Sequence, residues 1–174
     1  MSMLVLWALP TIVWLAVRRL SAEARQLCGM VVPAPRWWAV AAGVGALSLL
    51  IGAGIVSLLP DAAVAHSSTR IIGVASALSV AAAAIGEEIF FRGLLQGALA
   101  RWRGPRFALW GQAVFFLLPH LALLLIDARL WPLLPAQFLM GVLLGVLRER
   151  SGSLWPAALA HVITNVGTGL LIAA

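Results

Sequence analysis

Long apolar runs dominate this sequence and decide what the chain can fold into. Charges, prolines and glycines divide the 174 residues into about six runs, each near the roughly 20 residues of helix that a bilayer core requires. The pattern predicts an all-α fold, a polytopic transmembrane helix bundle of about six spans. The expected spans are Met3–Val17, Trp37–Leu59, Ile71–Ala100, Phe107–Ile126, Trp131–Leu147 and Leu154–Ala173.

Composition excludes other classes of protein. Hydrophobic residues make up 63% of the chain and charged residues only 10%, which is far from a soluble globular domain. The basic residues are all arginines, and except for Arg92 they lie in short segments between the apolar runs, which is typical of membrane topology and not of nucleic-acid binding. The single cysteine, Cys28, allows neither an internal disulfide nor a cysteine-based metal site.

The arginines also predict an orientation, because basic loops stay on the cytoplasmic side. Three connections rich in arginine alternate with two that hold one arginine each, offset by Asp61 and Asp127. We therefore expect a multi-pass protein of the cell membrane with both termini outside the cytoplasm. The rich connections carry Arg18, Arg19, Arg25 and Arg36, then Arg101, Arg103 and Arg106, then Arg148 and Arg150.

The polar stretch at residues 60–70 is the one candidate boundary. It divides the chain into residues 1–70, with two N-terminal spans and their loops, and residues 71–174, with four further spans.

Ionisable residues interrupt these four spans, although each costs at least a few kcal/mol at membrane depth. Glu88 and Arg92 are four residues apart and can pair on one helix face, whereas Glu87 is rotated about 100° away. His120 lies in the next span, and the last span carries His161 and Asn165.

Depth places these residues together. Counted from the arginines at the cytoplasmic end of each span at about 1.5 Å per residue, Glu87, His120 and Asn165 lie roughly 21 Å deep, and His161 roughly 16 Å. We expect one buried site. The alternative is structural: Glu88 and Arg92 as a helix-stabilising pair, and the histidines as hydrogen-bonding partners between helices. Pro119 is expected to kink its span and free a carbonyl near the site.

The run Gly86-Glu87-Glu88-Ile89-Phe90-Phe91-Arg92-Gly93 resembles the Glu-Glu-x-x-x-Arg motif of the CPBP or Abi intramembrane proteases, the type II CAAX prenyl endopeptidase group. Phe116-x-x-x-His120 and His161-x-x-x-Asn165 resemble that family's later motifs, in order and on separate spans. The resemblance covers roughly residues 71–170 and makes residues 71–174 a four-span catalytic core. Pro119 beside the histidine departs from that family's pattern.

Peptide hydrolysis needs a base for water and donors for the oxyanion. A carboxylate in a poorly hydrated site is a suitable base, and Glu87 is the candidate. Glu88 would hold Arg92 and the helix geometry, while His120 would orient the water or shuttle a proton. His161 and Asn165 would donate hydrogen bonds to the oxyanion, and the resemblance implies similar positions.

A metalloprotease is the alternative mechanism, because two histidines and a carboxylate can bind zinc. Its ligands would be Glu88, His120 and His161, although the His-Glu-x-x-His signature is absent. The sequence slightly favours a site without a cofactor, since Asn165 and Arg92 are better donors and charge partners than zinc ligands.

Two other classes of function stay open, a small proton-coupled transporter and a non-catalytic scaffold such as one for bacteriocin immunity. For the peptidase, the expected partners are the lipid bilayer and a membrane-embedded or lipid-anchored protein or peptide. The substrate itself is open: a CAAX protein, a leader peptide or a C-terminal sorting anchor.

Overall fold

Helices make up the whole regular structure of the described residues, 3–64 and 69–173 of a computed structural model. This confirms the predicted all-α bundle. The elements are α1 (Met3–Val17), α2 (Ala22–Leu27), α3 (Arg36–Val56), α4 (Asp61–Val64), α5 (Val74–Glu88), the π-helix η1 (Ile89–Leu95), α6 (Gln96–Arg103), α7 (Pro105–His120), α8 (Leu123–Ile126), the 3-10 helix η2 (Ala128–Leu130), α9 (Leu133–Ser151) and α10 (Trp155–Ala173).

The six predicted runs correspond to the long helices, with two differences. The third run is continuous but not uniform, because η1 joins α5 to α6. The fourth run breaks after His120, and a turn separates α7 from α8. The sequence predicts a kink at Pro119, and α7 instead ends at His120, one residue after the proline.

Within the described residues, four helical stretches are long and apolar enough to cross a membrane: residues 36–56, 74–103, 105–126 and 155–173. Large apolar side chains such as Leu50, Leu78 and Leu125 point outward and are 66–89% exposed, as expected of a surface that faces lipid. The chain is thus a helical membrane protein.

Two helices stand apart from these four. With 15 residues, or about 22 Å, α1 is shorter than a bilayer core. The last turn of α9 carries Arg148, Glu149 and Arg150, whose charges lower its apolar character. Six spans in all therefore stay a prediction.

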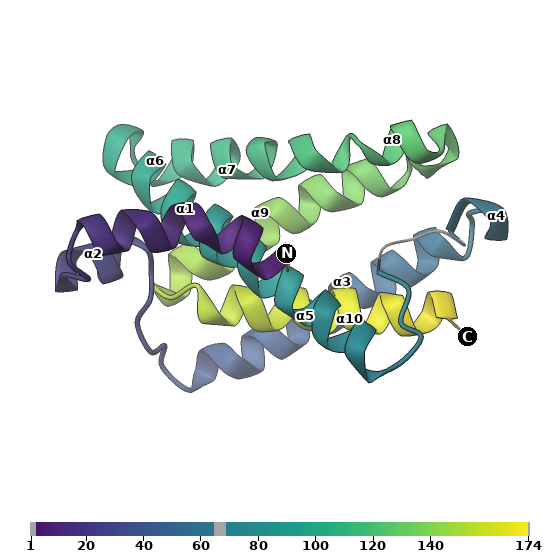
Figure 1. Cartoon of the computed structure of the whole chain (residues 1–174), viewed down its shortest axis with the longest axis horizontal. Coiled ribbons are helices and arrows are strands. Elements are labelled where there is room, and N and C mark those ends of the chain that lie inside the picture. Colours follow the sequence, from purple (N-terminus) through teal and green to yellow (C-terminus); the bar gives the residue numbers. More distant parts are fainter. Residues whose placement is uncertain (1–2, 65–68, 174) are drawn as a thin grey trace.

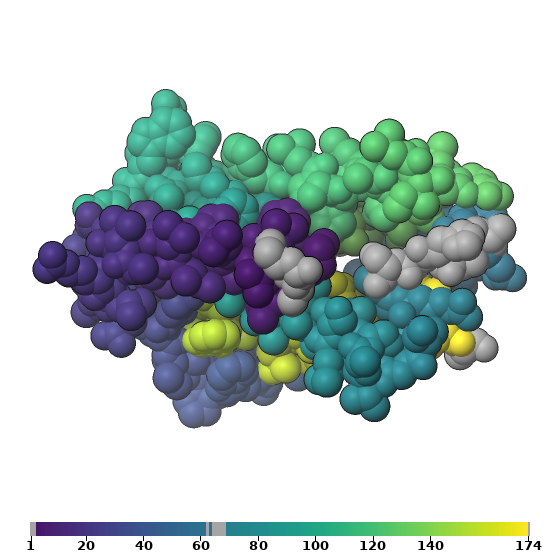
Figure 2. Space-filling view, in the orientation of Figure 1, coloured from purple at the N-terminus to yellow at the C-terminus, as the bar shows by residue number. Residues whose placement is uncertain are grey.

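The bundle is built from helix pairs. The helix α3 packs along α10 and α7 along α9, while α1 and α10 both pack on α5 (Figure 1). Figure 2 shows α1, in purple, between the green segments and the blue and yellow ones. Glycines allow the closest approaches: a Cβ at Gly45 would lie 2.9 Å from Ile163, and one at Gly141 would lie 3.2 Å from Ala113.

The arginine-rich connections lie at one end of this bundle. In Figure 1, α2 and the α6–α7 junction lie at the left, whereas α4, α8 and the C-terminus lie at the right. The grouping supports one cytoplasmic end, although the membrane orientation itself stays a prediction.

We expect residues 101–106 and 148–153 to face the cytoplasm and both termini to face outward. Alkaline phosphatase fused to the C-terminus should be active, and green fluorescent protein fused there should be dark. The reverse pattern should result from fusions that end in the 101–106 loop. A fluorescent C-terminal fusion would contradict the orientation.

Candidate active site

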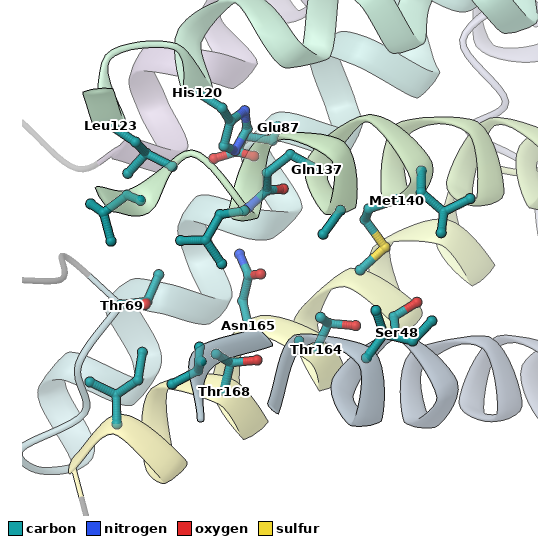
Figure 3. Close-up of a pocket in the computed structure, with 18 of the residues that line it drawn as sticks. Ser48, Thr69, Glu87, His120, Leu123, Gln137, Met140, Thr164, Asn165 and Thr168 are labelled. Carbon is teal, nitrogen blue, oxygen red and sulfur yellow. The ribbon is translucent and has the colours of Figure 1, made fainter. Parts of the chain in front are cut away.

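A cavity of about 290 Å³ lies inside the bundle, and three of the predicted site residues line it. Glu87 comes from α5, His120 from the end of α7 and Asn165 from α10. Figure 3 shows His120 and Glu87 on one side of the cavity and Asn165 further along it. Residues from three helices therefore face one space that is large enough for water and part of a ligand.

Glu88 and Arg92 form a completely buried ion pair behind this cavity. Arg92 Nη1 donates to Glu88 Oε1 at 2.6 Å, and neither side chain is exposed. Arg92 Nη2 also donates to the Gly141 carbonyl at 3.3 Å, and its guanidinium lies 4.3 Å from the centre of the Phe116 ring. These contacts tie the α5 and η1 stretch to α7 and α9.

The π-helix η1 sets the rotation of this stretch. At its end, Gln96 N donates to the carbonyl of Phe91, five residues back. Two side chains from other elements donate hydrogen bonds to backbone carbonyls of η1. Thr11 Oγ1 donates to the Ile89 carbonyl at 3.0 Å, and Arg148 Nε donates to the Arg92 carbonyl at 3.2 Å.

His161 lies between the two glutamates and is itself 2% exposed. Its Nδ1 is 2.8 Å from Glu88 Oε1, and its Nε2 is 3.9 Å from Glu87 Oε2. The first distance is a hydrogen bond, and the second is too long for one but close enough for an electrostatic contact. Glu88 thus accepts from both His161 and Arg92, whereas Glu87 keeps its carboxylate toward the cavity.

His120 has one ring nitrogen engaged and one available. Its Nδ1 is 2.8 Å from the Phe116 carbonyl, and because a carbonyl can only accept, this nitrogen carries the proton. In the neutral ring, Nε2 is then an acceptor. Phe116 also packs against both histidines, with ring centroids 4.8 Å from His120 and 5.8 Å from His161.

The proposed zinc ligands Glu88, His120 and His161 are not gathered as a set. In the part of the chain that the structure describes, no group of three or more His, Cys, Asp or Glu side chains is arranged to hold a metal ion. Two of the three side chains are occupied by each other and by Arg92. The zinc alternative thus has no ligand set among these residues.

Several buried polar residues escaped the sequence analysis because they carry no charge. Gln96 Nε2 donates to the Gly145 carbonyl at 3.0 Å, and Gln112 Nε2 donates to the Gly141 carbonyl at 2.8 Å. Gln96 follows Arg92 by four residues, so it extends the same polar stripe. The signal that could have identified both glutamines in the sequence is an uncharged polar residue inside an apolar span.

Replacement of Arg92 by alanine should destabilise the fold strongly. The change leaves the Glu88 charge buried without its arginine partner, which typically costs about 3–5 kcal/mol. Thermal unfolding of the purified protein in detergent measures the effect. In the double variant Glu88→Gln and Arg92→Ala, where no charge is stranded, much of the loss should be recovered. An Arg92→Ala protein that melts at the parental temperature would contradict this account.

Comparison with protein families gives one match. The family described as type II CAAX prenyl endopeptidase Rce1-like matches residues 69–167, which is more than half of the chain. The match includes α5, η1, α6, α7 and α9 and most of α10, and so contains the six site residues predicted from the sequence: Glu87, Glu88, Arg92, His120, His161 and Asn165. No significant match exists among curated proteins or among solved structures. The chain belongs to the type II CAAX prenyl endopeptidase Rce1-like family, whose members are proteases of the membrane.

Proposed function

We propose that this protein is an intramembrane endopeptidase in which Glu87 activates the attacking water. The observation that carries the proposal is the different placement of two adjacent glutamates. Glu87 lines the cavity with a side chain that is 16% exposed, whereas Glu88 is fully buried and bonded to Arg92 and His161. Only Glu87 is free to take a proton from a water in the cavity.

In the proposed reaction, Glu87 accepts a proton as the water oxygen bonds to the substrate carbonyl carbon. The C–N bond then breaks, and the proton passes to the leaving nitrogen. His120, whose Nε2 is an acceptor in the neutral ring, holds the second hydrogen of the water and can relay a proton. This matches the role that the sequence assigns to His120.

Asn165 is the proposed donor to the oxyanion. It lines the same cavity as Glu87, and no described residue hydrogen bonds its amide, so the NH2 group is available. An amide that is already in place needs little reorganisation when charge develops on the carbonyl oxygen.

For His161 we propose a role different from the oxyanion donor expected on the sequence. Its Nδ1 bonds to Glu88 and its Nε2 lies near Glu87, so it fixes the two carboxylates relative to each other. Glu88 and Arg92 in turn fix His161 and the helix. We regard these three as positioning residues.

The proposed substrate is a membrane-embedded or lipid-anchored protein or peptide in the cell membrane. The cavity lies among helices that carry lipid-facing side chains, and its walls are mostly apolar. A CAAX protein, a leader peptide and a C-terminal sorting anchor all have this chemistry.

Glu87→Gln should lower the rate of cleavage at least about a hundredfold, because glutamine keeps the shape and loses the base. Cleavage of candidate membrane proteins is measured by co-expression and then with purified protein in vesicles. Glu149→Gln is the matched control, since it makes the same change at an exposed position. Both variants should unfold near the parental temperature.

Parental cleavage by a folded Glu87→Gln protein would rule out this mechanism. A scaffold reading would then gain support, because it requires no base. The proton-coupled transporter would instead be favoured if the parental protein cleaved nothing but drove proton uptake into vesicles, and Glu87→Gln lost that uptake.

Asn165→Ala should lower kcat by about a hundredfold, as the loss of one oxyanion donor typically does. The unfolding temperature should change little, because no described residue hydrogen bonds the amide. Asn165→Asp should be at least as slow, since it places a carboxylate beside the developing negative charge. An Asn165→Ala protein with unchanged kcat would remove Asn165 from the proposed mechanism.

A further inference from the structure

Ser48, in the middle of α3, has a buried hydroxyl with no hydrogen-bond partner among the described residues. The residue is 9% exposed, and among the described residues no group accepts from or donates to its Oγ. Ser48 also lines the cavity that contains Glu87, His120 and Asn165. Burial of an unpaired hydroxyl is unfavourable, so such groups in native structures call for a specific explanation.

The neighbouring hydroxyl of Thr164 shows that pairing was available in this part of the bundle. Thr164 Oγ1 donates to the Ala160 carbonyl one turn back at 2.9 Å, and lies 3.3 Å from the Gly45 carbonyl of α3. A serine in a helix can make the same bond to its own helix. Ser48 does not, so its hydroxyl stays available to a molecule in the cavity.

Ser48 lies at the opposite end of the cavity from the candidate base (Figure 3). Figure 3 shows Ser48 with Thr164 and Met140 at one end, away from His120 and Glu87. Met140 and Leu143 of α9 form an apolar wall of the same cavity, while Ser48, Thr164 and Asn165 form a polar wall on α3 and α10. One wall can therefore hold apolar side chains and the other can hydrogen bond a backbone.

We infer that Ser48 is a substrate-binding residue that hydrogen bonds a main-chain amide of an unwound, apolar peptide segment, a few residues from the scissile bond. The inference rests on the proposed peptidase function. A helix has its backbone groups paired within itself, and a segment that is extended for cleavage exposes them in a poorly hydrated space. A hydroxyl can both donate and accept, so it suits either backbone group.

Ser48→Ala tests this inference because binding and structural roles predict opposite changes in stability. If no protein bond is lost, the unfolding temperature should stay the same or rise. The value of kcat/KM should nevertheless fall about tenfold, as expected for one lost hydrogen bond to substrate. The probe is an internally quenched apolar decapeptide in phosphatidylethanolamine and phosphatidylglycerol vesicles, with and without a C-terminal S-farnesyl cysteine.

A second measurement locates the bond. Backbone amides of the probe are replaced one at a time by esters, which removes an N–H and weakens the carbonyl as an acceptor. At one position the ester should lower the parental kcat/KM about tenfold and that of Ser48→Ala less than twofold. Such non-additivity is the signature of a direct contact.

Ser57→Ala is the matched control, because Ser57 caps the C-terminal end of the same helix, its hydroxyl bonds to the Gly54 carbonyl, and it does not line the cavity. It should leave kcat/KM unchanged. A clearly lower unfolding temperature for Ser48→Ala, or an unchanged kcat/KM, overturns the inference. Glu87→Gln, measured in the same assay, separates the two proposals. If Glu87→Gln loses cleavage while Ser48→Ala keeps the parental kcat/KM, only the Ser48 inference is refuted.

Discussion

The Arg92 guanidinium is completely buried in an apolar bundle, and its contacts account for much of the arrangement around the site. A cation at this depth must be paired, and Glu88 supplies the opposite charge at 2.6 Å. The other contacts come from different helices: the Gly141 carbonyl of α9 and the Phe116 ring of α7. Because Glu88 also bonds to His161, the same charge pair aligns α5, α7, α9 and α10.

This requirement for pairing explains why Glu87 is different from its neighbour. Arg92 and His161 occupy the carboxylate of Glu88, and the next residue along the helix is turned toward the cavity. Two identical side chains thus acquire different surroundings from rotation alone. A rigid ion pair beside a carboxylate that faces the cavity is an arrangement suited to holding a base in place.

The sequence predicts the helices, their approximate ends and several residues of the cavity. Both the length of an apolar run and the position of an ionisable residue within it can be read directly along the chain. It does not predict η1, whose carbonyls accept hydrogen bonds from Thr11 and Arg148 of distant helices. Nor does it predict that His161 lies between the glutamates, or that Ser48 is left unpaired, since both depend on how α3, α5 and α10 pack. The roles proposed for the site residues remain predictions.

The π-helix also gives the chain a tolerance of length that its composition does not reveal. A π-turn bonds five residues back instead of four, so η1 holds about one residue more than an α-helix needs for the same advance. Each residue of an α-helix turns the chain by about 100°, but the wider turn of η1 takes up the extra residue, and Gln96 meets the Gly145 carbonyl while Glu87 and Glu88 keep their places. A one-residue deletion within Ile89–Leu95 is therefore expected to be absorbed by a return to α-helical bonding, whereas the same deletion in an α-helical part of the span would rotate the two sides of the deletion out of register.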